Sequence, residues 1–325
     1  MKTSNKIAAA AVLALLGAAA QAQQSSVSLY GLMDLSVGSF KAPGGKAIKR
    51  TESGSMTTSF IGFSGREDLG GGLTASFALE SFLLADGGTA GRFNGDAMWA
   101  RSAFVALNSK ELGTLKMGRN TTPLFVSTLS FNAFGDSFGF SPAIRHTFTS
   151  GTVTGDTGWS DSVHYIAPKI GGFSAGVIAA AGEGSGGRNW GANAGYGAGA
   201  FAASAVYQKV AKGATVDDTE TMQIAASYDF GAAKLFGQYS DVENSTTKRD
   251  YKLTNVGVAV PIGGGKLLAQ YGRISASAGA DRKTYTVGYD YFLSKRTDVY
   301  AAYMSDKLTG LSSGVSYGAG IRHRF

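Results

Sequence analysis

Apolar and polar residues alternate with a period of two along much of the chain. From Thr284 to Tyr291, every second position is tyrosine or valine, and the positions between them are small or polar. The same alternation recurs at 73–80, 201–208, 223–230 and 317–324, and no segment keeps a helical period. Successive side chains of a strand point to opposite faces, so this pattern predicts strands with one apolar and one polar face.

Two fold classes would give such strands. A soluble sandwich buries the apolar face in a core, whereas a membrane barrel turns it toward lipid and keeps the polar face on a wet lumen. The connections favour the barrel because short and long ones alternate. Seven short, turn-rich connections are expected at 68–72, 108–113, 168–172, 195–199, 229–234, 261–266 and 294–297. Eight longer ones are expected near 39–56, 84–96, 120–158, 183–189, 211–218, 244–250, 276–281 and 307–313.

These connections predict an all-β fold, a transmembrane antiparallel β-barrel of sixteen strands. Closure matters in a membrane, because lipid offers an open sheet edge no hydrogen-bond partners. Aromatic residues gather beside the short turns, as in a girdle at one membrane interface. They are Tyr165, Phe173, Phe201, Phe230, Tyr291 and Phe325.

The first residues resemble a targeting segment. Lys2 and Lys6 precede a short apolar stretch, and Ala20-Gln21-Ala22 has the small-x-small pattern of a cleavage site. We therefore expect a signal peptide at 1–22 and a porin-like barrel domain at 23–325. A membrane anchor or a buried helix is the alternative, but the apolar stretch is short for ~30 Å of hydrocarbon. No second long apolar stretch follows, and with no cysteine the chain has no disulfides.

The third long connection, near 120–158, is unusual in length and composition. It carries six phenylalanines, and connections of more than about 15 residues are usually functional or disordered. Disordered segments lack aromatic residues. We expect this loop to fold into the lumen and narrow the pore. A cap over the barrel mouth or a contact between subunits is the alternative.

The charges suggest what such a pore would prefer. The formal net charge is +7, and removing Lys2 and Lys6 leaves +5. This balance fits either a mildly basic surface or a lumen that favours anions. Candidate pore-lining residues are Arg66, Arg101, Arg119 and Arg145, with Arg322 and Arg324 near the exit and Glu80, Asp34 and Asp136 as candidates for the opposing wall. For each arginine, the alternative is a surface position or a salt bridge at the mouth.

Catalytic and cofactor patterns are weak. His146, His164 and His323 are dispersed, without a zinc-protease motif or a cysteine partner. The stretch 182–187 matches G-x-G-x-x-G by letter, but it lacks the strand and helix of a dinucleotide site. No nucleophile elbow is present, and lysines and arginines are scattered singly. The sequence therefore predicts no enzyme, no cofactor, no metal and no nucleic-acid partner.

Several motifs resemble the trimeric general porins of Gram-negative outer membranes, in particular their β-proteobacterial branch. They are SSVSLYG at 25–31, GFSGREDLGGGL at 62–73, RSAFVAL at 101–107, LGTLKMGR at 112–119, LSKRT at 293–297 and GIRHRF at 320–325. The resemblance covers the whole chain after the expected cleavage site. It implies a sixteen-stranded barrel, a homotrimer and a third loop folded into the pore.

The resemblance also implies a location and partners. The chain would sit in the outer membrane with its lipid and lipopolysaccharide, pass small hydrophilic solutes and ions, and use Phe325 as a signal to the barrel-assembly machinery. Some anion-selective members have arginines along the narrow part of the pore, and Arg101 and Arg145 stand where two of these would fall. A third such position is Phe60 here, which predicts a weaker anion preference. A barrel enzyme such as a lipid hydrolase, or a non-conducting adhesin, remains the alternative.

Overall fold

The computed structural model describes residues 26–183, 187–211 and 216–325, and the expected signal peptide lies outside them. The strands are β1 (Ser26–Phe40), β2 (Ile48–Ser53), β3 (Phe60–Gly70), β4 (Leu73–Leu84), β5 (Thr89–Ala90), β6 (Ser102–Ser109), β7 (Gly113–Thr121), β8 (Gly158–Ile166), β9 (Phe173–Ala180), β10 (Asn189–Ala198), β11 (Phe201–Val210), β12 (Thr219–Asp229), β13 (Lys234–Asn244), β14 (Arg249–Ile262), β15 (Gly265–Ala276), β16 (Arg282–Phe292), β17 (Thr297–Leu308) and β18 (Gly314–Arg324). Two helices, α2 (Pro123–Ser130) and α3 (Pro142–Phe148), lie between β7 and β8. Among the described residues, no helix has the length and apolarity to cross a membrane.

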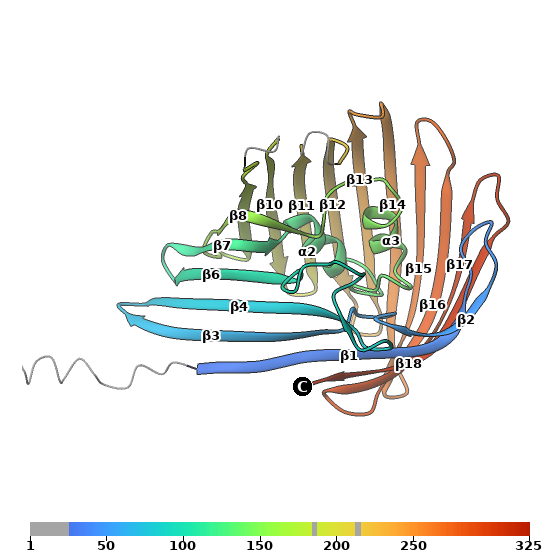
Figure 1. The fold of residues 1–325 in the computed structure, drawn as a ribbon, viewed down its shortest axis with the longest axis horizontal. Coiled ribbons are helices and arrows are strands. Elements are labelled where there is room, and N and C mark those ends of the chain that lie inside the picture. Colours follow the sequence, from blue (N-terminus) through green and yellow to red (C-terminus); the bar gives the residue numbers. More distant parts are fainter. Residues whose placement is uncertain (1–25, 184–186, 212–215) are drawn as a thin grey trace, which may run out of the picture.

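Sixteen of these strands form one closed antiparallel barrel, as predicted (Figure 1). The other two, β2 and β5, belong to long connections. Closure comes from β1, which pairs with β18 from Leu32↔Arg324 to Ser39↔Tyr317 and with β3 on its other side. The short and long connections alternate as expected wherever the structure describes them.

The partner of β1 is interrupted, which the pattern of residues did not predict. β3 pairs with the first part of β1 and β2 with the last part, and residues 54–59 leave the wall between them. Gly54 begins this excursion with a φ of +74°, a conformation that favours glycine. Asp34, a residue of the wall, holds the excursion in place. Its Oδ2 accepts hydrogen bonds from the backbone N–H groups of Met56 and Thr57, each at 2.7 Å.

The two faces of the wall differ as a membrane barrel requires. On β16, Thr284, Thr286 and Asp290 are buried toward the interior, whereas Tyr285 and Tyr291 are exposed on the outside. The aromatic residues expected beside the short turns are all exposed. A second set of outward tyrosines lies toward the long connections, and it consists of Tyr207, Tyr239, Tyr271, Tyr285, Tyr303 and Tyr317. The wall therefore has an aromatic girdle at each end of its apolar band.

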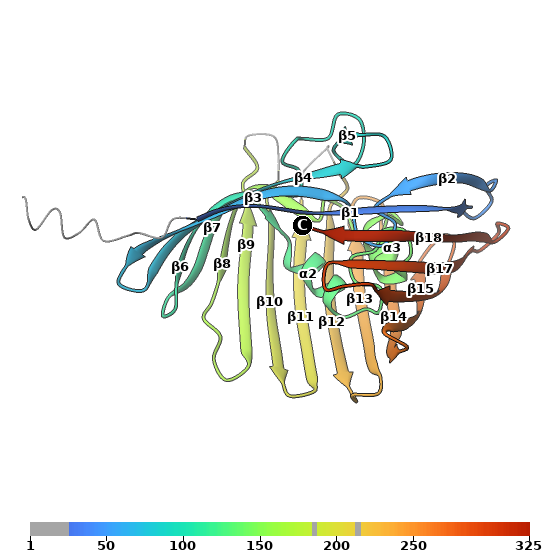
Figure 2. The same cartoon turned by 90° about the horizontal axis from the view of Figure 1, so that it is seen from below.

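The third long connection, called loop 3 from here on, folds inside the barrel (Figure 2). Both of its helices begin in the same way, with a hydroxyl cap followed by proline. Thr122 Oγ1 accepts from the Phe125 N–H at 3.2 Å, and Ser141 Oγ accepts from the Ile144 N–H at 3.3 Å. Such caps satisfy backbone donors that the first helical turn leaves free. α2 packs against β10–β12, and α3 packs against β14–β16.

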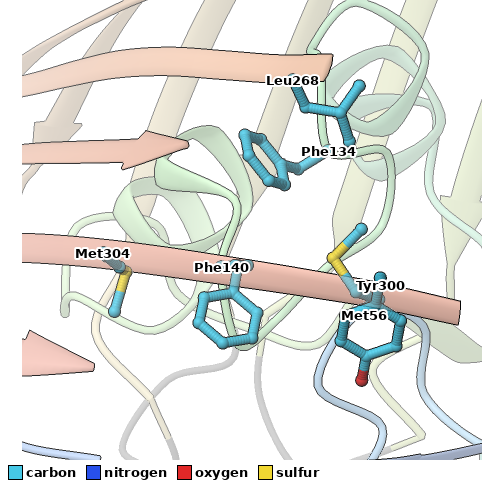
Figure 3. Packing of buried hydrophobic residues seen from close by; sticks show 7 residues of the cluster. Met56, Phe134, Phe140, Leu268, Tyr300 and Met304 are labelled. Atoms are coloured by element: carbon cyan, nitrogen blue, oxygen red, sulfur yellow. The ribbon is translucent and has the colours of Figure 1, made fainter. Parts of the chain in front are cut away.

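Loop 3 buries its aromatic side chains against the inner wall. Phe134 and Phe140 pack with Met56 of the excursion and with Leu268, Tyr300 and Met304 of the wall (Figure 3). The wall has a glycine, Gly272, where the loop approaches it closely. A Cβ added to Gly272 would lie only 2.8 Å from Pro142 Cβ. The loop therefore narrows the lumen, as expected, and does not cap the mouth.

Candidate functional site

Loop 3 leaves a cavity on each side. The outer cavity, of about 890 Å³, faces the long connections and is lined by residues such as Lys46 and Arg92. The inner cavity, of about 910 Å³, extends toward the short turns and includes Lys169 and Gly172. Arg101 and Thr121 line both cavities. They therefore mark the junction between the two halves of the lumen, which we call the constriction.

Arg101 is held at the constriction by two neighbours, Glu80 and Phe60. Its Nη1 donates to Glu80 Oε2 at 2.5 Å, and its guanidinium carbon lies 4.0 Å from the centre of the Phe60 ring. Glu80 also accepts a hydrogen bond from the Tyr30 hydroxyl at 2.8 Å. A guanidinium on an aromatic face with one carboxylate partner is fixed in place but keeps donors free. With 31% of its side chain exposed, Arg101 presents positive charge to the lumen.

Arg145 and Asp136 reach the outer cavity from loop 3. Arg145, on α3, donates to the Phe138 carbonyl at 3.2 Å and lies 3.7 Å from Asp306. Asp136 accepts a hydrogen bond from the Thr57 hydroxyl at 3.0 Å. Burial raises the pKa of Asp136 above its ordinary value, so this carboxylate loses its charge at a higher pH than an exposed aspartate.

Both cavities carry an excess of positive side chains. The outer cavity is lined by six cations and three carboxylates. The six cations are Lys41, Lys46, Arg50, Arg92, Arg101 and Arg145, and the carboxylates are Glu52, Asp136 and Asp156. In the inner cavity, Arg101, Lys116 and Lys169 stand against Glu80. Fixed charges on the low-dielectric walls of a narrow cavity raise the local concentration of ions of opposite sign.

The model of the Gram-negative porin family matches residues 8–311. The chain belongs to this family. The porin is 34% identical over 235 residues to outer membrane porin protein 32 of Delftia acidovorans, which covers 68% of this chain and 65% of that protein. It is 33% identical over 183 residues to an outer membrane porin protein of Bordetella pertussis, covering 52% of this chain and 46% of that protein. The aligned part of the porin thus spans about half to two thirds of the length of these relatives. Its location is the Gram-negative outer membrane.

Solved structures share the fold. An anion-selective porin from Comamonas acidovorans superposes with a TM-score of 0.80 at 28% identity, covering 93% of the porin and 100% of that chain. In vitro folded OmpT of Vibrio cholerae, described in a trimer form, superposes with a TM-score of 0.70 at 15% identity, covering 93% of the porin and 99% of that chain. The second likeness shows the fold alone.

Five of the nine residues expected to line the pore of the porin, or its exit, line neither cavity; Arg322 and Arg324 are described below, and the other three are Asp34, Arg119 and Arg66. Asp34 is fully buried behind the excursion, where it also accepts a hydrogen bond from the Tyr300 hydroxyl at 2.6 Å. Arg119 donates to the Ala100 carbonyl and to Asp156, each at 2.5 Å. Arg66 is exposed at the short-turn end of β3. The other four, Arg101, Glu80, Asp136 and Arg145, do border the cavities.

Sequence reasoning missed several charged residues that line the porin's lumen. Lys41, Lys46 and Arg50 lie on the first long connection, and Arg92 on the second. A weak signal was present, because Lys46, Lys49 and Arg50 make a short basic run. Nothing in the sequence, however, indicates that this connection leans over the lumen.

Asp156 fastens the end of loop 3 to the rim of the porin. Arg92 donates to both of its carboxylate oxygens, at 2.8 and 3.0 Å, and Arg119 donates to one of them. Burial alone would raise the pKa of Asp156, but these guanidinium groups hold it below its ordinary value. Asp156 therefore stays charged and keeps the end of loop 3 fixed.

Arg322 occupies a different environment from Arg101. It is only 8% exposed and donates to Asp298 Oδ1 at 2.6 Å, to Asp290 Oδ2 at 2.5 Å and to the Thr57 hydroxyl at 3.1 Å. These partners join β16, β17 and β18 to the excursion. Arg324 shares Asp298 but is 44% exposed. Arg322 thus clamps the wall together behind loop 3.

The three histidines of the porin lie apart. His146 Nε2 is 2.7 Å from the Thr284 hydroxyl behind α3, His164 lines the inner cavity, and His323 Nδ1 is 2.9 Å from the Thr297 hydroxyl. In the part of the chain that the structure describes, no group of three or more histidines and carboxylates is placed to hold a metal ion.

Proposed function

We propose that the porin forms a water-filled channel for the passive diffusion of small hydrophilic solutes and ions, with a modest preference for anions. The observation that carries the proposal is the position of Arg101, which borders both cavities at the constriction. Each ion that crosses would pass this charge at close range. An arginine on an external loop would instead be screened within ~8 Å at physiological salt.

Two further observations support the direction and strength of the preference. The Comamonas acidovorans porin with the same fold is described as anion-selective. Here, however, Phe60 lies beneath Arg101, and Glu80 neutralises part of its charge. Carboxylates also border the outer cavity. We therefore expect selectivity weaker than that of family members with an arginine in place of Phe60.

Planar-bilayer recordings test the proposal. Purified porin should give stepwise, ohmic conductance, and its reversal potential in a salt gradient should show anion preference. The double substitution Arg101→Ser and Arg145→Ser should move the reversal potential toward cations, most strongly at low salt. The matched control is Arg66→Ser with Arg249→Ser, which also removes two charges but from residues that border neither cavity. Equal shifts in both variants, or cation selectivity of the wild type, would refute the assignment of the constriction.

The proposal includes a homotrimer. OmpT, which shares the fold, is described in a trimer form. The outer face of β1, β17 and β18 carries an apolar furrow of about 620 Å³ lined by Leu35, Val37, Ala319 and Ile321, a surface suited to another protein wall. Native mass spectrometry should give the mass of three chains, and conductance should rise in groups of three steps. A monomer that conducts fully would disprove this part alone.

We further propose that the chain is cleaved after Ala22 and that Phe325 serves assembly by the barrel-assembly machinery. Phe325 exchanges two backbone hydrogen bonds with Gly31, at 3.1 and 3.2 Å, next to the closing seam. Deleting Phe325 should lower the yield of folded, heat-modifiable protein in the outer membrane, whereas Phe325→Trp should preserve it. Mass spectrometry of the purified protein reports the cleavage site.

The proposal assigns the porin no catalytic activity and no cofactor. A barrel enzyme such as a lipid hydrolase, or an adhesin, is the competing class. A barrel enzyme or a non-conducting adhesin would give no ion current in the planar-bilayer recording. Release of fatty acid from phospholipid by purified porin, lost in a single side-chain variant, would favour the enzyme.

A further inference from the structure

The outer cavity is rich in aromatic side chains as well as in cations. Six phenylalanines line it, whereas two phenylalanines and two tyrosines line the inner cavity. The six are Phe40, Phe82, Phe93, Phe125, Phe138 and Phe148. The last three of them belong to loop 3, which lies inside the barrel (Figure 2). The outer half of the lumen therefore combines positive charge with apolar aromatic surface.

Loop 3 divides its six phenylalanines between two environments. Phe131, Phe134 and Phe140 are buried, with at most 9% of each exposed. The other three stay half-buried and face the cavity. Apolar surface in contact with water costs free energy, so a loop that needed its phenylalanines only for packing would bury them all. The three rings that face the cavity point to contact with a partly apolar solute.

These three rings touch one another, and we call them the aromatic platform. Phe125 stacks with Phe138, with ring centres 6.0 Å apart and ring planes inclined by 25°. Phe125 also meets Phe148 edge to face, with ring centres 5.4 Å apart. Stacked and edge-to-face contacts are the arrangements that aromatic rings prefer. A flat ring in the cavity could therefore join the platform by the same kind of contact.

Arg145 stands beside the aromatic platform with hydrogen-bond donors to spare. It lies three residues before Phe148 on α3, and its Nη1 donates to the Phe138 carbonyl at 3.2 Å. Its Nη2 is 3.7 Å from Asp306, too far for a hydrogen bond, and its Nε has no hydrogen-bond partner among the described residues. A guanidinium carries five N–H donors, so most of those on Arg145 remain available.

Asp306 neutralises Arg145 only in part. Arg282 donates to both carboxylate oxygens of Asp306, with Nε at 2.8 Å from Oδ1 and Nη2 bound to Oδ2. One carboxylate thus faces two guanidinium groups. The positive charge that is left over favours an anion beside Arg145.

We infer that the outer cavity binds aromatic monocarboxylates on their way through the channel. The ring of the solute stacks on the aromatic platform, and its carboxylate accepts hydrogen bonds from Arg145. The cavity, of about 890 Å³, lies within the range of ~300–1,000 Å³ that small-molecule sites occupy. The inference deepens the proposed function and rests on it, because it names a class of solute for the same channel.

Each half of the site disfavours a different class of solute. An inorganic anion would pair with Arg145 but leave the aromatic platform in water. A neutral aromatic molecule would stack but leave the guanidinium without a counter-charge, and an aromatic cation would meet an excess of positive side chains. A flat ring with one carboxylate uses both halves, and a carboxylate matches the paired N–H groups of an arginine. Because a transported solute must leave again, its affinity should lie in the millimolar range.

Blockade of the ion current tests the inference in folded porin in a planar bilayer. Benzoate is added in chloride solution to each side in turn, and the current is followed as its concentration rises. Acetate, which lacks the ring, and benzyl alcohol, which lacks the charge, are the comparison probes. The test variant combines Phe125→Leu with Phe138→Leu. The matched control combines Phe104→Leu with Tyr196→Leu, which changes two half-buried aromatic residues that line the inner cavity.

Benzoate should block wild type and the control at millimolar concentration, and acetate or benzyl alcohol should need roughly tenfold more. The test variant should need roughly tenfold more benzoate for half blockade, relative to its own current in chloride alone. Arg145→Gln should weaken the blockade by benzoate by a similar factor and leave that by benzyl alcohol unchanged. Equal blockade by benzoate and acetate would overturn the inference, as would equal blockade of the test variant and the control. Benzyl alcohol as effective as benzoate would also overturn it, because Arg145 would then have no part in binding.

Binding measured without a membrane separates this inference from the proposed function. Saturation-transfer NMR detects contact between benzoate and porin in non-ionic detergent, and the test variant corrects for benzoate dissolved in the micelle. A stronger signal from wild type than from the test variant, in a porin that does not conduct, would support the site and refute only the channel. An anion-selective channel whose wild type and test variant give equal signals would refute only the site.

Discussion

Arg101 and Arg322 are the same type of residue, and both point into the barrel. Arg101 has one carboxylate partner, borders both cavities and keeps 31% of its side chain exposed. Arg322 has two carboxylate partners, keeps only 9% of its side chain exposed and borders neither cavity. The difference arises from loop 3 and the excursion at 54–59, which cover one part of the inner wall and leave another open. An inward arginine therefore faces either the lumen or buried carboxylates, depending on what covers it.

The largest effect is expected for Arg322→Met. Removing the guanidinium leaves Asp290 buried without its counter-charge and leaves Asp298 with Arg324 alone, which should cost about 3–5 kcal/mol of unfolding free energy. Arg324→Met is the matched control, because Arg324 also binds Asp298 but is 44% exposed, and its loss should cost about 1 kcal/mol or less. Urea unfolding of the folded porin, followed by heat-modifiability on gels, measures both. Similarly small losses of unfolding free energy in both variants would show that Arg322 stabilises the wall no more than Arg324 does.

Two carboxylates extend the comparison: Asp34, which holds the excursion, and Glu80, which binds Arg101. Asp34→Asn should destabilise the porin by about 1–3 kcal/mol, because a buried acceptor of two backbone N–H groups loses its charge. The reversal potential of Asp34→Asn should match that of wild type.

Glu80→Gln should have the opposite pattern of effects. It releases Arg101 from its carboxylate partner and should increase anion preference, with little loss of stability. Unfolding and reversal potentials of both variants are the measurements, and a selectivity change in Asp34→Asn would place that residue in the pore.

The contact behind α3 should depend on pH. Burial lowers the pKa of His146 from 6.5 to about 3, so the folded protein holds this ring neutral. The Thr284 hydroxyl donates to Asp306, and it therefore accepts from the His146 Nε2–H. Between pH 6.5 and about 3 the unfolded chain binds a proton that the folded chain does not, so stability falls as the pH drops, by at most about 1.4 kcal/mol per pH unit.

His146→Gln is the matching variant, because its amide can donate to Thr284 but does not titrate. Its unfolding midpoint should fall less than that of wild type between pH 6.5 and 4.5. Parallel curves would show that other groups cause the acid sensitivity.

The smallest effect is expected for Arg119→Ser. Arg119 binds Asp156 and the Ala100 carbonyl at the rim, and Arg92 also holds Asp156, so the loss should be about 1 kcal/mol or less. The reversal potential should stay where it is, in contrast to Arg101→Ser. A shift as large as that of Arg101→Ser would mean that Arg119 reaches the lumen.

The fold was largely predictable because it depends on local patterns. The alternation from Thr284 to Tyr291 indicated which side chains face lipid, and the turn residues gave the number of strands. Six phenylalanines predicted a packed third loop, and the structure buries Phe134 and Phe140. The excursion at 54–59 was missed because no turn signal distinguishes it from the rest of the first long connection.

The candidate site was predictable only in part. Arg101 was expected in the pore from its place before a strand in a known motif, and Arg145 from its place in the long loop, and both border the outer cavity. Asp34 and Arg119 were expected in the pore on the same kind of argument, yet the structure places them behind the excursion and at the rim. A period of two assigns a residue to a face of the wall, but the face alone does not say whether loop 3 covers it.

The sequence by itself determined the antiparallel barrel, its outward apolar face and the existence of an internal loop, because these follow from side-chain alternation and turn chemistry. Only the tertiary structure decided which charges meet water. Arg101 and Arg322 lie about 220 residues apart, and the segments that cover or expose them come from elsewhere in the chain. The electrostatics of the lumen therefore depend on contacts between distant segments, which no local pattern encodes.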